Sequence, residues 1–142
     1  MSMASWKKEF YPKKASKVSK KNALKHSLNK WIGLTKKNLR KHNILVNEDD
    51  ATVLYDLDNN GIDIDGSSCA LCHHFYEPTS VDSSHCKGCI LFQVRNGVPC
   101  HESSDNYELS PWEHWIVNEN PLPMIRLLKR AVAFQEKTKT KS

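Results

Sequence analysis

The sequence predicts a small α+β domain that is stabilised by zinc and contains a β-hairpin, two Cys-x-x-Cys knuckles and flanking helices. Two cysteine pairs, Cys69–Cys72 and Cys86–Cys89, are separated by 13 residues. Each pair directs two thiolates toward one tetrahedral centre, so two pairs complete a closed four-sulfur site. Only 39% of the 142 residues are hydrophobic, which leaves a modest core. A structural zinc contributes roughly 10 kcal/mol of apparent folding free energy to a small module, so we expect one domain that the metal helps to fold.

The fifth cysteine leaves the fourth ligand open. Cys100 is an alternate ligand in place of Cys86, or else a small buried residue. A nucleophilic role beside His101 is not favoured, because no third group is evident to orient such a pair. Zinc is the expected metal, with an iron–sulfur cluster as the alternative, because tetrahedral sulfur suits both. Three histidines adjoin the predicted ligands and are expected to be exposed or to support the cysteines, with direct ligation as the alternative: His73, His74 and His85.

Periodicity and capping signals place helices around this site. Apolar residues at helical spacing are followed by turn or cap residues. Ser110 followed by Pro111 is typical of a helix start. The predicted elements are helices over 22–32, 35–42, 110–119 and 123–136, and a strand over 90–94. The corresponding organisation is a disordered basic arm over residues 1–19, a zinc-binding domain over 20–136 and a frayed C-terminal tail over 137–142.

The acidic segment 48–65 predicts the β-hairpin. Two β-rich runs flank the turn dipeptide Asn60-Gly61. Asp56, Asp58 and Asn60 also match the first half of a calcium-binding EF-hand loop. The second half does not match, because Ser67 occupies the position that requires a bidentate glutamate. The hairpin is therefore favoured over a calcium site.

Charge is distributed unevenly along the chain. Residues 1–41 contain 13 Lys and Arg and a single acidic residue, Glu9, whereas the rest contains 8 basic and 15 acidic residues. A basic arm on an acidic body is typical of a tail that meets nucleic acid, and the alternative is an arm that folds back onto its own domain. Aromatic residues among the lysines favour nucleic acid slightly, because they stack on unpaired bases. The lysines expected to contact phosphates are Lys7, Lys8, Lys13, Lys14, Lys17, Lys20 and Lys21.

The sequence argues against several other classes of protein. It lacks a secretory signal and a long apolar run, so we expect a soluble protein of a reducing compartment, with no membrane contact. Zinc deaminases require a His-x-Glu and a Pro-Cys-x-x-Cys motif, and neither cysteine pair follows a proline. A ββα metal nuclease would need its catalytic hairpin and helix between the pairs, where 13 residues are too few. Four thiolates also leave no open position for catalysis, so the site is expected to be structural and the protein not an enzyme.

Several short motifs occur along the second half of the chain: Ser68-Cys69-Ala70-Leu71-Cys72, Cys86-Lys87-Gly88-Cys89-Ile90-Leu91, Cys100, Ser110-Pro111-Trp112 and Met124-Ile125. Together they resemble a family of small cysteine-cluster proteins of tailed bacteriophages. The segment around Trp31 is similar to the early part of that family, and Ile90 departs from it, since the family has proline there. The resemblance covers roughly residues 22–136 and implies a metal-binding phage protein of the host cytoplasm without an assigned activity.

From these features we expect a non-enzymatic, zinc-binding phage accessory protein that contacts nucleic acid or a host machine that handles nucleic acid. The alternative is a protein-interaction module, or an inhibitor of a host enzyme, whose acidic body imitates nucleic acid. No small-molecule substrate is evident.

Overall fold

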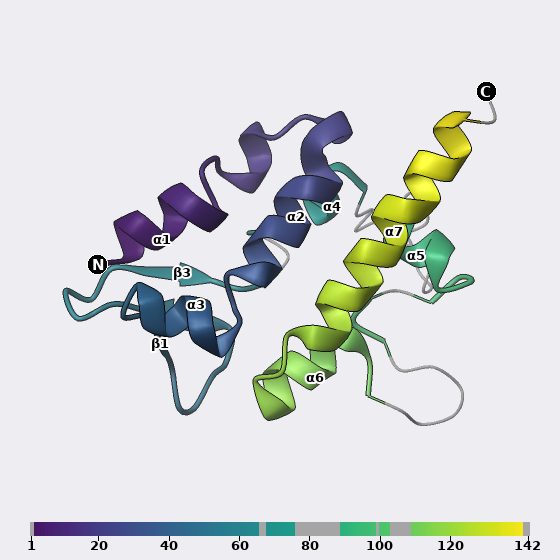
Figure 1. The fold of residues 1–142 in the computed structure, drawn as a ribbon. Helices are drawn as coiled ribbons and strands as arrows, with labels where there is room; N and C mark the ends of the chain where they lie inside the picture. The colour runs from purple at the N-terminus through teal and green to yellow at the C-terminus, as the bar shows by residue number, and fades with distance from the viewer. Residues whose placement is uncertain (1, 66–67, 76–88, 99, 103–108, 141–142) are drawn as a thin grey trace.

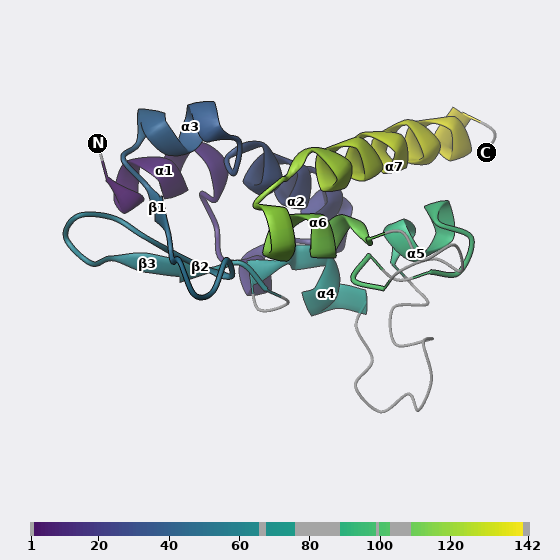
Figure 2. The ribbon, with the colours of Figure 1, turned by 90° about the horizontal axis from the view of Figure 1, so that it is seen from below.

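Helix α2 (Ala23–Ile32) lies between the N-terminal helix α1 (Met3–Phe10) and the long C-terminal helix α7 (Leu122–Thr140) (Figure 1). The computed structural model describes residues 2–65, 68–75, 89–98, 100–102 and 109–140. A small sheet lies at one end of the molecule and the end of α7 at the other (Figure 2), so the predicted α+β class is confirmed. The remaining elements are the 3-10 turns η1 (Ala15–Lys17) and η2 (Lys20–Asn22), the helices α3 (Lys36–Lys41), α4 (Ala70–Phe75), α5 (Ile90–Val94) and α6 (Pro111–Asn118), and the strands β1 (Leu45–Val46), β2 (Val53–Tyr55) and β3 (Gly61–Asp63).

Helix α2 is the central packing element. Its buried face includes Leu24, Ser27 and Trp31, which recur at the helical spacing that the sequence predicted. This face contacts α1, α4 and α7. The helix ends at Gly33, where a Cβ atom would lie 2.6 Å from Cγ of Phe10. Glycine is therefore required at this point, because α1 packs directly onto the end of α2.

Helix α1 corrects the prediction of a disordered arm over residues 1–19. Ser2 and Ser5 form a capping box that starts the helix. Met3, Trp6 and Phe10 lie on one face and are buried in the core. The Trp6 indole N–H donates a hydrogen bond of 3.0 Å to the carbonyl of Gly33. The first lysines of this segment, Lys7 and Lys8, therefore belong to an ordered, amphipathic helix.

The sheet has the order β1-β2-β3, with antiparallel pairing throughout. The predicted hairpin is confirmed as β2 and β3, and β1 adds a short strand that the sequence did not indicate. The turn differs in position from the prediction. Asn59 has the positive φ of 63°, and Gly61 is already in β3, opposite Tyr55. The turn is thus centred before the Asn60-Gly61 dipeptide.

Asp56 fixes the hairpin turn and ties it to α1. One carboxylate oxygen accepts hydrogen bonds from the amides of Asp58 and Asn60, at 3.0 and 2.9 Å. The other accepts a hydrogen bond of 2.8 Å from the amide of Met3. The Met3 amide, followed by that of Asn60, holds the pKa of the Asp56 carboxyl below its ordinary value of 3.8. The carboxylate that would begin an EF-hand loop thus serves as a structural acceptor.

Helix α5 replaces the strand predicted over residues 90–94. Cys89 precedes its first residue, and the helix ends in a turn with positive φ at Asn96 and Gly97. The Gly97 amide donates a hydrogen bond of 2.9 Å to the carbonyl of Phe92, which is the closure typical of a helix C-terminus. The Asn96-Gly97 dipeptide therefore ends a helix.

The C-terminal helices follow the sequence prediction more closely. Ser110 and Glu113 form a capping box at the start of α6, with Pro111 as its first residue. Trp115 is fully buried and donates from its indole nitrogen to the carbonyl of Ala51 at 2.9 Å. Its ring lies 6.0 Å from that of Trp31 in an edge-on arrangement. Helix α7 continues to Thr140, beyond the predicted end at residue 136.

Candidate metal centre and lysine-lined groove

Four cysteine side chains line one small cavity, which we call the cysteine cavity. It is bordered by Cys69, Cys72, Cys89 and Cys100, together with three apolar side chains, Leu71, Leu91 and Phe92. Three of the predicted zinc ligands are therefore brought together. The fourth, Cys86, lies outside the described residues, and Cys100 takes part in the lining.

The cysteines reach the cavity from three short segments. Cys69 directly precedes α4, and its carbonyl accepts a hydrogen bond from the amide of His73. Cys72 lies in the first turn of that helix. The predicted knuckle at Cys69–Cys72 is thus the N-terminal turn of a helix. Cys89 occupies the N-cap of α5. The carbonyl of Cys100 accepts a hydrogen bond of 3.2 Å from the Trp112 amide, which attaches this segment to α6.

The cavity has a volume of about 20 Å³. A space of roughly 10–15 Å³ by this measure holds one water-sized atom. Within the described parts of the chain, no three His, Cys, Asp or Glu side chains converge closely enough to coordinate a metal ion. The cysteines therefore surround a space suited to one atom without forming a coordination sphere around it.

A buried lysine lies beside the thiols. Lys30 of α2 is only 1% exposed, and its ammonium group donates to the carbonyl and hydroxyl oxygens of Ser68, at 3.1 and 3.2 Å. Burial lowers the pKa of Lys30, whereas Cys69, Cys72 and Cys100 act to raise it. The Lys30 ammonium group therefore lies close enough to these thiols to interact with them electrostatically, although Lys30 does not line the cysteine cavity.

The thiol of Cys69 is strongly perturbed by its surroundings. A hydrogen bond from Cys72 lowers the pKa of Cys69 well below its ordinary value of 9.0, and burial opposes the shift. The charge of Lys30 and the hydroxyl of Ser27, 3.5 Å from the sulfur, contribute to the lowering. This environment favours a thiolate, which is the form that binds metals.

The histidines have different positions. His74 donates a hydrogen bond to the carbonyl of Val18, which joins α4 to the segment before α2. His73 is exposed, and neither of these two side chains lines the cysteine cavity. His85 lies outside the described residues.

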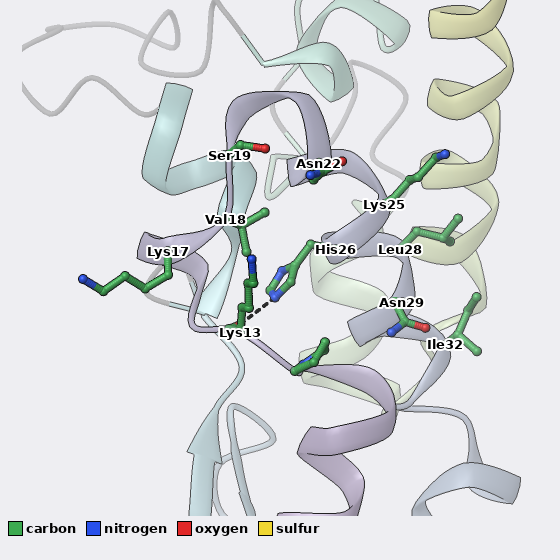
Figure 3. Close-up of a pocket in the computed structure, with 11 residues that line it drawn as sticks. Lys13, Lys17, Val18, Ser19, Asn22, Lys25, His26, Leu28, Asn29 and Ile32 are labelled. Carbon is green, nitrogen blue, oxygen red and sulfur yellow. Dashed lines mark hydrogen bonds between the residues drawn. The ribbon is translucent and has the colours of Figure 1, made fainter.

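A second feature is an open groove between residues 12–19 and helix α2, which we call the lysine groove (Figure 3). Its volume is about 760 Å³. Lys13 and Lys17 belong to the segment before α2, and Lys25 belongs to α2 itself. Three cationic side chains therefore line the groove from two different segments. No acidic side chain of the described residues lines it. The rest of the lining combines amides with apolar side chains, among them Asn22, Asn29, Leu28 and Ile32.

Tyr11 and His26 hold the wall of the groove in place. The rings of Tyr11 and His26 are 4.9 Å apart, and the Tyr11 hydroxyl accepts from the amide of Ala15 at 2.9 Å. Nε2 of His26 donates a hydrogen bond of 2.7 Å to the carbonyl of Lys13 (Figure 3). Nδ1 is buried and has no hydrogen-bond partner among the described residues. Burial lowers the pKa of His26 below its ordinary value of 6.5, so the neutral ring is the structural form.

The structure separates the predicted phosphate-contacting lysines into three groups. Lys13 and Lys17 line the lysine groove, whereas Lys7 and Lys8 belong to α1. The sequence did not single out Lys25. Its position on the side of α2 away from the buried Leu24 and Trp31 is the signal that could have found it. The remaining predicted lysines are exposed along the segment that leads into α2: Lys14, Lys20 and Lys21.

Comparison with known proteins provides no relative for this chain: no family model, no curated protein and no solved structure matches it. In the described part of the chain, no helix combines the length and apolar character needed to span a bilayer.

Proposed function

We propose that this protein is a non-enzymatic nucleic-acid-binding protein that holds the phosphate backbone in the lysine groove. The observation that carries the proposal is the gathering of Lys13, Lys17 and Lys25 around one groove without an acidic side chain in its described lining. Lysines that neutralise phosphates release counterions, and this release supplies sequence-independent affinity. The resemblance to small phage proteins supports an accessory role in the host cytoplasm.

The dimensions and lining of the groove suit a nucleotide chain. A volume of about 760 Å³ is within the range of roughly 300–1,000 Å³ found for pockets that bind small ligands. The apolar side chains of Leu28 and Ile32 offer a surface for a base or sugar, and Asn22 offers an amide for hydrogen bonding. Single-stranded nucleic acid fits this combination better than a duplex, because its bases are free to enter the groove.

The cysteine cavity supports a structural role rather than catalysis. Its volume of about 20 Å³ leaves no room for a substrate beside a metal ion, and a catalytic zinc needs an open position. Zinc is proposed as a structural cofactor that positions the helices around α2.

A charge-reversal experiment tests the function. The triple variant Lys13→Glu, Lys17→Glu, Lys25→Glu removes the cations of the groove. A matched control, Lys36→Glu, Lys37→Glu, Lys129→Glu, changes the net charge equally at exposed lysines on α3 and α7. We expect the groove variant to bind a fluorescent single-stranded oligonucleotide at least roughly tenfold more weakly than the control, because three phosphate contacts are lost. Fluorescence anisotropy measures the affinity, and melting curves confirm that both variants fold.

The salt dependence provides an independent readout. For single strands, the slope of log affinity against log salt changes by about 0.7 per phosphate contact. The groove variant should therefore flatten this slope by about two. Equal binding by the two triple variants would show that the affinity is diffuse and that the groove is not the site. Binding of a basic protein together with no binding of DNA or RNA would favour the protein-interaction alternative.

A further inference from the structure

We propose that Cys69, Cys72, Cys89 and Cys100 together bind one zinc ion. Because four thiolates complete a tetrahedral site, this set does not require Cys86 as a ligand. Of the two ligand sets that the sequence left open, it is the one in which Cys100 replaces Cys86. It does not depend on the lysine groove, so either proposal can fail without the other.

The backbone explains why Cys100 is a ligand. Cys89 starts α5, and the turn at Gly97, with φ of 91°, ends that helix and reverses the chain. The reversal returns Cys100 to the cavity that Cys89 already lines. Trp112 then holds the Cys100 segment through a backbone hydrogen bond of 3.2 Å. Two cysteines with ten residues between them are thus brought together by one short helix and its C-terminal turn.

The size of the cavity selects a single ion. About 20 Å³ accommodates one water-sized atom, whereas an iron–sulfur cluster would need space for several iron and sulfide atoms. Zinc binds thiolates at about 2.3 Å in tetrahedral geometry. No three described ligands stand close enough together to coordinate a metal ion, so coordination at that distance requires the sulfur atoms to lie closer together. Metal binding is therefore expected to draw α4, α5 and the Cys100 segment together.

Two cations near the cavity support this assignment. Lys30 is buried, donates to Ser68 immediately before Cys69, and interacts with the charges of three of the cysteines. Arg95 interacts with Cys100 and donates to the carbonyl of Glu102 at 3.0 Å. A buried cation is costly unless nearby anions compensate it. Four thiolates around one zinc carry a net negative charge, which adds to the compensation that Asp65 provides for Lys30 and that Glu102 and Glu113 provide for Arg95.

Thiol protection tests the ligand set in the unaltered full-length protein. The chain has five cysteines, so zinc-loaded protein treated with N-ethylmaleimide should acquire one label, mapped by mass spectrometry to Cys86. After removal of zinc by a chelator, all five thiols should react. A label on Cys100, or protection of Cys86, would overturn the proposed set. Absence of zinc from protein produced in zinc-supplemented medium, or iron with acid-labile sulfide in its place, would overturn the single-zinc site.

Two variants provide a second test by elemental analysis. Cys86→Ser should retain about one zinc per chain and the wild-type melting transition. Cys100→Ser should lose most of the bound zinc. Loss of zinc from Cys86→Ser, or full retention by Cys100→Ser, would contradict the assignment. If Cys100→Ser does not fold, the labelling of the wild-type protein and the zinc content of Cys86→Ser still decide the question.

Discussion

The N-terminal part of the molecule and the segments around the cysteine cavity differ in the size of the apolar side chains that they bury. In residues 2–65, large side chains such as Trp6, Leu54 and Ile64 are completely buried. In the described residues between 68 and 102, the buried apolar positions are Ala70, Leu71, Cys89 and Leu91. Full burial of a large apolar side chain contributes roughly 1.5–3 kcal/mol. The first region is therefore stabilised by apolar burial, whereas the second has little to bury and places four thiols around a cavity.

This difference is consistent with the two proposed roles, nucleic-acid binding and zinc binding. An apolar core that does not depend on metal can hold the wall of the lysine groove, because Tyr11, His26 and α2 all belong to the N-terminal part. The metal would then stabilise the segments that the core reaches least. Lys30 joins the two regions, since it lies on α2 and donates to Ser68.

The largest expected effect comes from breaking the apolar region. Trp6→Ala removes a fully buried indole and its hydrogen bond to Gly33. Truncation of a buried aromatic side chain costs about 3–5 kcal/mol of unfolding free energy, measured by denaturant unfolding of zinc-loaded protein. Lys8→Ala, on the exposed side of the same helix, is the control and should change stability by less than about 0.5 kcal/mol. A small effect of Trp6→Ala would show that α1 contributes little to the core.

Sequence patterns predicted the helices and the hairpin that have clear periods or caps. Repeated apolar positions and turn residues correctly predicted the helices α2, α3, α6 and α7 and the β2–β3 hairpin. Helix α1 was missed because its lysine content outweighed the helical spacing of Met3, Trp6 and Phe10. Helix α5 was predicted as a strand because a run of five largely apolar residues has no distinct period.

The candidate sites were only partly predictable for a related reason. The spacing of the Cys-x-x-Cys pairs indicated Cys69, Cys72 and Cys89, which do line one cavity. The approach of Cys100 depends on the turn at Gly97, and a tertiary reversal of this kind has no sequence period. The lysine groove likewise requires residues 12–19 to be placed against α2 before Lys13, Lys17 and Lys25 are seen to share it.

The hydrogen bonds between Lys30 and Ser68 join the two regions, and breaking them is expected to have an effect of intermediate size. Lys30→Met keeps the length of a buried side chain but removes its charge and its hydrogen bonds to Ser68. Loss of a group that supports metal ligands typically lowers metal affinity by about 10–100-fold. We expect a decrease of that size in zinc affinity, measured by competition with a chromophoric chelator. Lys36→Met, at an exposed lysine on α3, should leave the affinity unchanged. Equal affinities for the two variants would remove Lys30 from any role at the cysteine cavity.

The smallest expected effect is the pH dependence of the groove wall. Because burial holds the pKa of folded His26 below its ordinary value of 6.5, the unfolded chain binds a proton near that pH which the folded protein does not bind. Stability rises with pH wherever the unfolded state binds more protons, so His26 should make the fold less stable as the pH falls below about 6.5. Protonation at Nδ1 would also leave a buried N–H without an acceptor among the described residues.

The variant His26→Gln isolates this effect, because glutamine can still donate to the carbonyl of Lys13 but does not titrate. We expect the wild-type melting temperature to fall more than that of the variant between about pH 7.5 and pH 5.5, at equal zinc content. The pKa values of Glu9, Asp50 and Asp56 are lowered, so these carboxylates remain ionised across that window and contribute little to the difference. Parallel pH profiles for the two proteins would mean that His26 is not held in its neutral form. His26 would then gain a proton within the folded protein as the pH falls, and the charge of the groove wall would change. Measuring nucleic-acid affinity at both ends of the pH window determines whether binding changes with it.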